Sequence, residues 1–220
     1  MNGKELILIG GGGHCKAIID VALAAHRSIM GILDNGLEKG NNVLGVPVIG
    51  SDNDIKSIVE QYGNDVEFLI SVGQIKSADI RRKIFDEIIN AGGMLASPLI
   101  SPSAHIAKGA KVGNGTAIMH NAVVNANAIV GENCIINTGA IVEHDCNIGD
   151  FVHISTGAIM NGVSSIGSDS FLGSHATIAN TIKVCAETII GAGAVVISHI
   201  SQSGTYYGVP AKRITSIRHE

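Results

Sequence analysis

Aliphatic residues recur at every sixth position through the second half of the chain. The series runs from Ile100 to Val196, and all seventeen of its positions carry Ile, Val, Leu or Met with no insertion. A second series, from Ala104 to Ile200, lies four residues after the first, and fifteen of its seventeen members are Ala, Ser, Thr, Cys or Val. A repeat this strict predicts stacked coils of parallel β-structure, with one hexapeptide on each flat side of a triangular coil. We therefore expect a left-handed parallel β-helix of about five to six coils.

The same repeat assigns a place in the coil to each residue type. The aliphatic residues are expected to point inward and stack on their equivalents in neighbouring coils, with the small residues inside the corners. Cys134 and Cys146 belong to the small series, so we expect both to be core residues. Glycine recurs one place after the aliphatic residue, where we expect it to permit a tight corner backbone. These glycines are Gly113, Gly131, Gly149, Gly167, Gly173 and Gly191.

Residues 1–95 follow a different pattern, in which short apolar runs alternate with helical segments. The expected strands are 5–9, 29–33 and 66–72, and the expected helices are 14–25, 52–61 and 77–90. This alternation predicts a small, Rossmann-like parallel sheet with crossover helices. Two prolines, Pro98 and Pro102, mark the junction with the repeats. We expect an α/β domain at 1–95, followed at 96–220 by an all-β domain that ends in a C-terminal tail.

A glycine turn, Gly10–Gly13, lies between the first expected strand and the first expected helix. Backbone amides and a helix N-terminus at such a turn suit a phosphate group. Cys15 stands where the dinucleotide fingerprint has its third glycine, so a plain tight turn is the alternative. Asp34 ends the next strand, where an acidic residue can meet a ribose or a base, and Gly73 follows the third strand on the same edge. We favour a nucleotide diphosphate ligand over a dinucleotide.

Composition narrows the classes of partner. The formal net charge of −4 gives no reason to expect binding to nucleic acid or to an anionic membrane. No apolar run approaches the ~20 residues of a membrane span, and no signal peptide is expected. The four cysteines have no metal-ligand spacing, so we expect no metal and reduced thiols in a cytoplasmic protein.

Four segments carry a resemblance to a known family. They are Ile9–His14 (IGGGGH), Asn137–Cys146 (NTGAIVEHDC), Ile148–His153 (IGDFVH) and Tyr207–Arg213 (YGVPAKR). Together with the order of the two domains, they resemble the bacterial sialic acid O-acetyltransferase and nucleotide-sugar N-acetyltransferase family of hexapeptide-repeat acyltransferases. The resemblance covers nearly the whole chain. It identifies 1–95 as a nucleotide-sugar-binding domain and 96–220 as the acetyltransferase domain.

The resemblance implies a homotrimer with active sites between adjacent β-helices and acetyl-CoA as co-substrate in the groove. The implied acceptor is a UDP- or dTDP-linked 4-amino-4,6-dideoxy sugar of bacterial surface-glycan biosynthesis. The implied catalytic residues are His144 as general base, with Asp145 and Glu143 beside it. The implied acetyl-CoA contacts are His153, Gly162, Ser174 and Ala192. The implied nucleotide-sugar contacts are Gly12, Gly13, His14, Asp34, Asn35 and Gly73.

Chemistry read from the residues agrees with the implied role of His144. Histidine titrates near working pH and suits removal of a proton from an attacking amine. His144 stands two places after Val142, at an outward position, so the alternative is a solvated surface histidine. His153 follows nine residues later, half a coil away, and we expect the two to meet only across a trimer interface. The alternative for His153 is a packing residue at that interface.

Other functions remain open from the sequence. O-acetylation of sialic acid would use the same scaffold with another acceptor. We favour the amine because a phosphate-suited turn has no use for free sialic acid and because an amine is easier to deprotonate than a hydroxyl. A non-catalytic β-helix scaffold protein is a second alternative. A β-helix metal hydrolase would need three histidines, which the spacing of His144, His153 and His175 does not obviously supply.

Overall fold

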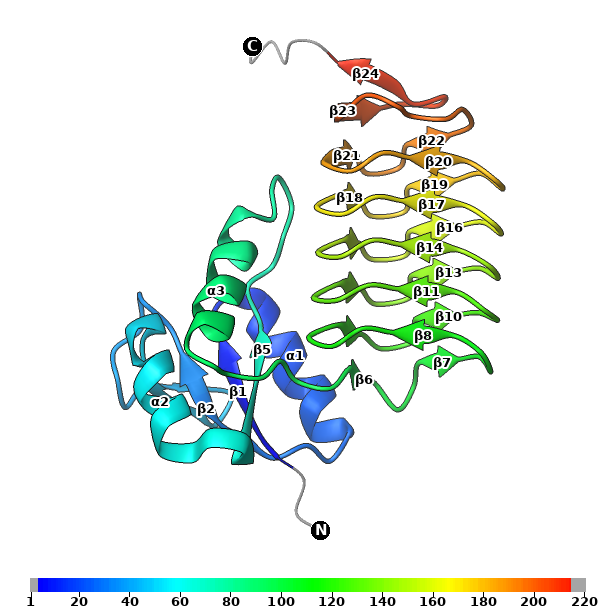
Figure 1. Cartoon of the computed structure of the whole chain (residues 1–220). Coiled ribbons are helices and arrows are strands. Elements are labelled where there is room, and N and C mark those ends of the chain that lie inside the picture. The colour runs from blue at the N-terminus through cyan, green and yellow to red at the C-terminus, as the bar shows by residue number, and fades with distance from the viewer. Residues whose placement is uncertain (1–3, 215–220) are drawn as a thin grey trace.

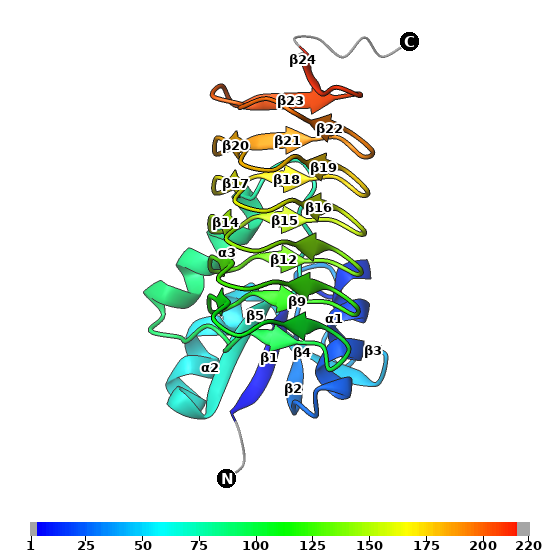
Figure 2. The same cartoon turned by 90° about the vertical axis from the view of Figure 1, so that its right-hand side faces the viewer.

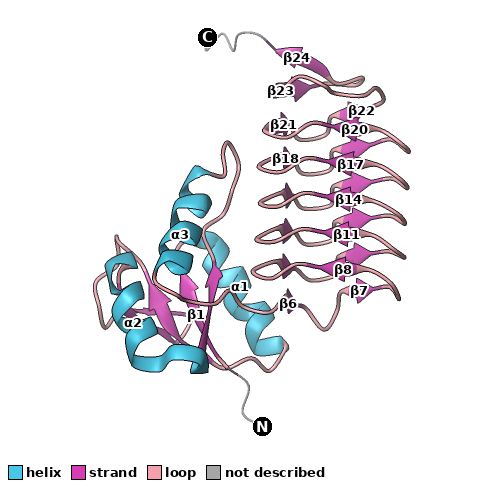
Figure 3. Ribbon diagram, in the orientation of Figure 1, coloured by secondary structure: helices cyan, strands magenta, loops and turns pink. Residues whose placement is uncertain are grey.

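The computed structural model describes residues 4–214. An α/β part, blue to green in Figure 1, lies beside the lower coils of a tall stack of short strands. The secondary-structure colouring of Figure 3 separates the helices of the first part from the all-strand second part. Among residues 4–214, no helix has the length and apolar character that a membrane crossing requires.

The α/β part contains a five-stranded sheet in the order β3-β4-β2-β1-β5. Its strands are β1 (Glu5–Ile9), β2 (Ile29–Leu33), β3 (Asn42–Val43), β4 (Val46–Gly50) and β5 (Val66–Ile70). Its α-helices are α1 (Gly13–Ala24), α2 (Ile55–Tyr62) and α3 (Asp79–Asn90), with 3-10 turns η1 (Asp52–Asp54) and η2 (Gly63–Asp65). All strand pairs are parallel except β3 with β4.

The predicted strands and helices are present, with shifts of one or two residues at several ends. The first part of the predicted helix 52–61 is the 3-10 turn η1, and α2 follows it. The prediction was wrong in omitting β3 and β4. Pro47 lies within β4 and argues against a strand there, while Gly45 turns the chain with a φ of +84°. The hairpin is therefore built from residues that local pattern assigns to a loop.

Residues of β1 alternate between the two layers that cover the sheet. Leu6 and Leu8 are buried with α1, while Ile7 and Ile9 are buried with α2 and α3. The first of these cores also includes Leu99 and other residues of the earliest repeats. Both faces of this mostly parallel sheet are thus covered, and α1 lies between the sheet and the β-helix.

The β-helix consists of seventeen short strands at the predicted spacing of six. They are β6 (Leu99–Ile100), β7 (His105–Ile106), β8 (Lys111–Val112), β9 (Ala117–Ile118), β10 (Val123–Val124), β11 (Ile129–Val130), β12 (Ile135–Ile136), β13 (Ile141–Val142), β14 (Asn147–Ile148), β15 (His153–Ile154), β16 (Ile159–Met160), β17 (Ser165–Ile166), β18 (Phe171–Leu172), β19 (Thr177–Ile178), β20 (Lys183–Val184), β21 (Thr188–Ile190) and β22 (Val195–Val196). A final hairpin, β23 (Gly204–Tyr207) and β24 (Lys212–Ile214), caps the stack.

The strands form three sheets, which we call face 1 (β6, β9, β12, β15, β18, β21, β23, β24), face 2 (β7, β10, β13, β16, β19, β22) and face 3 (β8, β11, β14, β17, β20). Strands within a face pair in parallel with equivalents one coil away, as Val124 does with Val142. The aliphatic and small series fill the interior, and Cys134 and Cys146 are buried there as predicted. The expected left-handed parallel β-helix is confirmed.

The predicted role of the repeated glycines was wrong. A Cβ on Gly113 would lie 2.7 Å from the backbone nitrogen of Glu132, and one on Gly167 would lie 2.4 Å from that of Ala186. These glycines therefore permit close stacking of successive coils. The left-handed corner conformation falls two residues later, at every sixth position from Gly109 to Gly193, with φ between +52° and +86°. Ten of these fifteen residues are not glycine.

The α/β part covers face 1 and contacts the two corners that bound it. Near the corner between faces 1 and 2, His120 Nε2 lies 2.8 Å from the Asp20 carboxylate of α1. At the corner between faces 3 and 1, Asp169 accepts two hydrogen bonds from Arg82 of α3. The third corner, between faces 2 and 3, points away from the α/β part, which lies behind the β-helix in Figure 2.

Candidate active site

His144 lies in the turn between β13 and β14, on the corner that points away from the α/β part. Its side chain is about half exposed, so the predicted outward orientation is confirmed. Nδ1 lies 2.8 Å from Oδ2 of Asp145. Because an ionised carboxylate only accepts, Nδ1 carries the proton and Nε2 presents a lone pair. This tautomer is the one that a general base requires.

Asp145 occupies a left-handed corner position with a φ of +58°, which aspartate tolerates better than most residues. The corner directs the carboxylate back toward the imidazole. The hydrogen bond from His144, together with one from Asn127, lowers the pKa of Asp145. The carboxylate is therefore ionised at neutral pH and accepts the hydrogen bond from Nδ1 of His144.

Two asparagines one coil below hold the acidic residues beside His144. Asn125 Nδ2 donates to Glu143 Oε2 at 3.0 Å, and Asn127 Nδ2 donates to Asp145 Oδ1 at 3.4 Å. Oε2 of Glu143 also accepts the backbone N–H of His144 at 3.4 Å. The sequence analysis missed both asparagines. Subtracting one coil of three hexapeptides from each acidic position would have found them, because stacked residues are neighbours.

Gly162 lies one coil above His144 and contacts its ring. A Cβ at this position would lie 2.6 Å from Nε2 and 2.7 Å from Cε1 of His144. Its φ is outside the left-handed region, so the glycine is needed for space and not for backbone conformation. Gly162 was predicted as a coenzyme contact, and the structure adds that its missing side chain makes room for the histidine.

His153 lies on β15 of face 1 and is buried against the α/β part. Its Nδ1 donates to the Gln74 carbonyl at 2.6 Å, and its Nε2 accepts from Asn137 Nδ2 at 3.0 Å. The Asn137 amide is oriented by Thr138, whose N–H donates to its Oδ1. Burial lowers the pKa of His153 to about 4, so it is neutral at working pH. Both ring nitrogens are hydrogen bonded within the chain.

His14, in the first turn of α1, faces the same junction. Its Cβ lies 3.6 Å from the position of a Cβ on Gly73, so two predicted sugar-nucleotide contacts are adjacent. Burial first, then the charge of Arg81 and the proximity of His153, lower the pKa of His14 to about 3. Its Nε2 is buried and has no hydrogen-bond partner within residues 4–214. The structure thus brings His14, Gly73 and His153 together.

The glycine turn contains two kinds of glycine. Gly10 has a φ of +102° and a Cβ there would lie 2.5 Å from Val72, so glycine is required; a Cβ on Gly11 would lie 2.5 Å from the end of the exposed Leu37 side chain. Nothing lies within 4 Å of a Cβ on Gly12 or Gly13. No side chain caps the helix that begins there. The open glycines and the uncapped helix N-terminus leave room for an anionic group to approach the backbone.

Asp34 braces the glycine turn from the end of β2. Its carboxylate accepts the backbone N–H groups of Gly11 at 2.6 Å, Gly36 at 2.8 Å and Leu37 at 2.9 Å. Partial burial raises the pKa of Asp34, but these three bonds outweigh it and leave the pKa below its ordinary value. Asn35 beside it exchanges two hydrogen bonds with Asp52.

A pocket of about 220 Å³ opens at this edge of the sheet. Asp34, Asn35 and Asp52 form its polar side, while Val72 and Ile80 belong to its apolar side. Ile80 is 64% exposed, which is unusual for a large aliphatic side chain. A lining that combines apolar side chains with hydrogen-bonding groups suits a nucleobase or a ribose.

The predicted coenzyme contacts are spread over the β-helix. Gly162 lies at the corner between faces 2 and 3, and His153 lies on face 1. Ser174 and Ala192 are stacked one coil apart at the corner between faces 1 and 2, where Ser174 Oγ is 3.0 Å from Ser155 Oγ. No single chain gathers these residues into one site.

Within residues 4–214, no group of three or more His, Cys, Asp or Glu side chains is placed to hold a metal ion. His144 and His175 belong to different corners, and His153 lies on a face. The histidine trio considered from the sequence is therefore not assembled in the chain.

Known proteins match both the N-terminal part of the chain and the chain as a whole. Residues 5–88 match the family model described as the PglD N-terminal domain. The acetyltransferase domain of PglB from Neisseria gonorrhoeae, solved with acetyl coenzyme A, is 33% identical and has a TM-score of 0.87. That match covers 96% of this chain and 100% of that domain.

A GDP-perosamine N-acetyltransferase from Caulobacter crescentus, PerB, was solved with CoA and GDP-perosamine. It is 33% identical, with a TM-score of 0.86, and the match covers 94% of this chain and 96% of that protein. WeeI from Acinetobacter baumannii is 24% identical with a TM-score of 0.83, which shows the shared fold alone.

Proposed function

The chain belongs to the nucleotide-sugar N-acetyltransferase family of hexapeptide-repeat acyltransferases, and we propose that it transfers the acetyl group of acetyl-CoA to the amino group of a nucleotide-linked sugar. The observation that carries the proposal is the exposed His144, whose Nδ1 is bound to Asp145 and whose Nε2 is free to accept a proton. A buried or doubly bonded histidine would lack this capacity.

His144 is the proposed general base. The amine nitrogen attacks the thioester carbonyl carbon, and Nε2 of His144 takes the proton that the nitrogen loses. Collapse of the tetrahedral intermediate expels the CoA thiolate, which takes the proton from Nε2 of His144 and leaves as the thiol, so that His144 returns to its neutral form. Asp145 fixes the tautomer and stabilises the imidazolium, and Glu143 holds the local backbone. Gly162 keeps the space over the ring open.

The site requires a second copy of the chain. The pocket beside Asp34 belongs to the α/β part, whereas His144 lies on the corner that points away from it. The outer side of face 2 carries Val123, Ile141 and Ile159, which are only partly buried in a single chain. This aliphatic stripe lies between the corner with His144 and the corner with Ser174. We propose that it packs in a homotrimer.

Such packing accounts for the scattered coenzyme contacts. If face 2 meets a neighbouring subunit, the corner of one subunit that carries Gly162 can approach the corner of the next that carries Ser174 and Ala192. Acetyl-CoA would then bind in the groove between two β-helices. The neighbour's α/β part would deliver the sugar through Gly12, Gly13, His14, Asp34, Asn35 and Gly73.

We assign residues 1–95 to nucleotide-sugar binding and residues 96–220 to acetyl transfer. The open Gly12 and Gly13 at the start of α1 suit the diphosphate. We also propose a cytoplasmic location, because acetyl-CoA and nucleotide sugars are intracellular metabolites and all four cysteines are unpaired.

The acceptor atom is tested by product analysis. Purified protein is offered acetyl-CoA with 4-amino-4,6-dideoxy sugars linked to UDP, dTDP or GDP, with a matched 4-hydroxy sugar and with sialic acid. Thiol release measures the rate, and NMR identifies the new bond. We expect an amide on a nucleotide amino sugar, and turnover reduced at least about a hundredfold in His144→Ala. An ester with no amide would instead establish O-acetylation of sialic acid or of another hydroxyl acceptor.

A further inference from the structure

Five buried side-chain atoms have no hydrogen-bond partner within residues 4–214, and all belong to the junction between the α/β part and the β-helix or to residues beside it. They are His14 Nε2, Gln74 Oε1, Arg81 Nε, Asn133 Nδ2 and Asn133 Oδ1. An unpaired buried polar group is costly, and apolar side chains would join two domains at lower cost. Their concentration at one place therefore indicates a role other than adhesion.

Arg81 lies at the centre of this junction and is 1% exposed. Its guanidinium donates to the carbonyl of Ile70 at 2.9 Å and to that of Val72 at 2.6 Å, both at the end of β5. It also donates to the carbonyl of Asn133 in a corner of the β-helix at 2.8 Å. Among the described residues it has no carboxylate partner. A fixed fork of donors spanning three carbonyls needs arginine and not lysine.

Two of the three carbonyls that Arg81 binds, those of Ile70 and Val72, lead into the loop that carries Gly73. The next residue, Gln74, reaches the β-helix with its side chain, donating to the Phe151 carbonyl at 2.8 Å, and its own carbonyl accepts from His153. Residues 70–74 are therefore held against the β-helix from both ends. This loop carries Gly73 of the proposed sugar-nucleotide site, and its contacts fix the α/β part on the β-helix of its own chain.

We propose that Arg81 is a positioning residue. It holds the loop 70–74 against the β-helix corner, and this places the sugar bound by the α/β part where it can reach the acetyl donor. The proposal rests on the proposed function. Arg81 touches neither substrate. Burial lowers its pKa only to about 10, so it stays charged at neutral pH. Substitution by lysine keeps the positive charge but removes the planar fork of donors, whereas substitution by methionine removes both.

The test compares Arg81→Lys and Arg81→Met with Arg82→Gln as a matched control. Arg82 is the next residue on α3 and also crosses the junction, but through a partly buried ion pair with Asp169 and by stacking on the Phe151 ring. Steady-state kinetics are measured well below the melting temperature of every variant. Both Arg81 variants are expected to lose at least tenfold in kcat/KM for the nucleotide sugar, with KM for acetyl-CoA within twofold of wild type. Arg82→Gln is expected to retain wild-type kinetics.

Gln74→Ala is the second variant, which keeps the buried charge and removes only one contact of the same loop. It should lower kcat/KM for the sugar by a smaller factor in a folded protein. A purely structural role would instead lower kcat/KM for both substrates by a similar factor, with Arg82→Gln behaving in the same way. Wild-type kinetics in Arg81→Lys and Gln74→Ala would overturn the positioning role of Arg81 and leave the proposed function standing. A wild-type protein inactive on every nucleotide amino sugar would overturn the proposed function.

Discussion

Gly162→Ala is the substitution for which the structure gives the sharpest expectation. The new Cβ would lie 2.6 Å from Nε2, 2.7 Å from Cε1 and 3.2 Å from Cδ2 of His144, whereas ordinary contact is 3.4–4 Å. The ring must therefore withdraw by about 1 Å. The backbone φ of Gly162 suits alanine, and the ring is at the free end of an exposed side chain. We expect the variant to fold, with the His144 ring displaced from the position that proton transfer requires.

A displacement of about 1 Å can lower a reaction rate by about a hundredfold, which corresponds to about 2.7 kcal/mol of transition-state stabilisation. Turnover is measured by thiol release at saturating concentrations of both substrates, with thermal melting as the check on folding. We expect kcat to fall and KM for acetyl-CoA to change little. If Gly162 served only as a coenzyme contact, KM for acetyl-CoA would rise instead.

A double-mutant cycle gives the control. In a His144→Ala background there is no ring to displace, so Gly162→Ala should cause no further loss of turnover. Additive losses in the two backgrounds would refute the reasoning, because they would show that the alanine acts on something other than His144. Wild-type turnover in the single variant would refute it as well.

Three further changes test separate parts of the proposal. Asp145→Asn keeps a residue that tolerates the left-handed corner but removes the ionised acceptor of His144, so we expect kcat to fall at least about tenfold with the melting temperature unchanged. Gly12→Ala meets nothing within 4 Å and should weaken nucleotide-sugar binding in calorimetry without destabilising the fold, whereas Gly10→Ala, at a φ of +102° and with a Cβ 2.5 Å from Val72, should lower both binding and stability. Ile159→Lys on the outer side of face 2 should dissociate the trimer in sedimentation and abolish activity, and an active monomer would contradict the shared site.

The β-helix was predictable because its order is local. A period of six fixes which residues point inward, and the buried state of Cys134 and the outward state of His144 both follow from it. The same period gives stacked neighbours, so the contact of Asn127 with Asp145 was available from the sequence in principle. The strands β3 and β4 could not be predicted in this way, because Pro47 argues against a strand and Gly45 marks a turn. These strands are stabilised by pairing with each other and with β2.

The junction could not be predicted from the sequence. His153 is bonded to Gln74, a residue 79 positions away on another domain, and nothing in the repeat says which face the α/β part covers. From the sequence, we expected His153 to lie at a trimer interface. The structure gives it a partner in its own chain, and that partner is a backbone carbonyl, whose identity leaves no trace in residue type.

The buried state of His153 leads to a prediction about acid stability. Burial lowers its pKa to about 4, against about 6.5 in an unfolded chain. Between these values the unfolded chain binds a proton at His153 and the folded chain does not, so stability falls as the pH falls through this window. The difference between these two pKa values corresponds to a loss of roughly 3 kcal/mol in the free energy of unfolding at pH 4. His14, whose pKa is lowered to about 3, adds a loss of the same sign.

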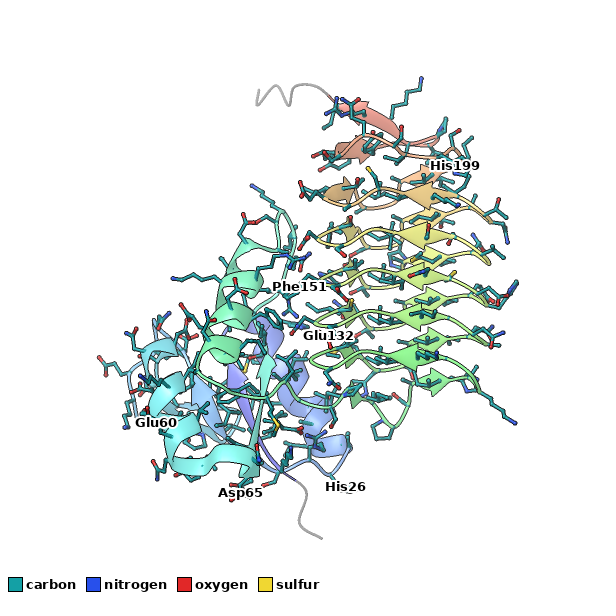
Figure 4. All side chains as sticks on the ribbon, in the orientation of Figure 1. His26, Glu60, Asp65, Glu132, Phe151 and His199 are labelled. Carbon is teal, nitrogen blue, oxygen red and sulfur yellow. The ribbon has the colours of Figure 1, made fainter. Side chains whose placement is uncertain are left out.

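Replacing His153 by glutamine separates this effect from ordinary loss of packing. Glutamine keeps hydrogen-bonding capacity at the junction but does not titrate, so His153→Gln should be less stable than wild type at pH 7.5 and should lose less stability on acidification to pH 4.5. Denaturant unfolding at one fixed protein concentration measures both, since subunit association contributes to the free energy. His26→Gln is the control for the substitution itself, because His26 is exposed at the lower end of the α/β part (Figure 4). Parallel pH profiles for wild type and His153→Gln would show that His153 takes up a proton without loss of stability, and would contradict its lowered pKa and its neutral, doubly hydrogen-bonded state.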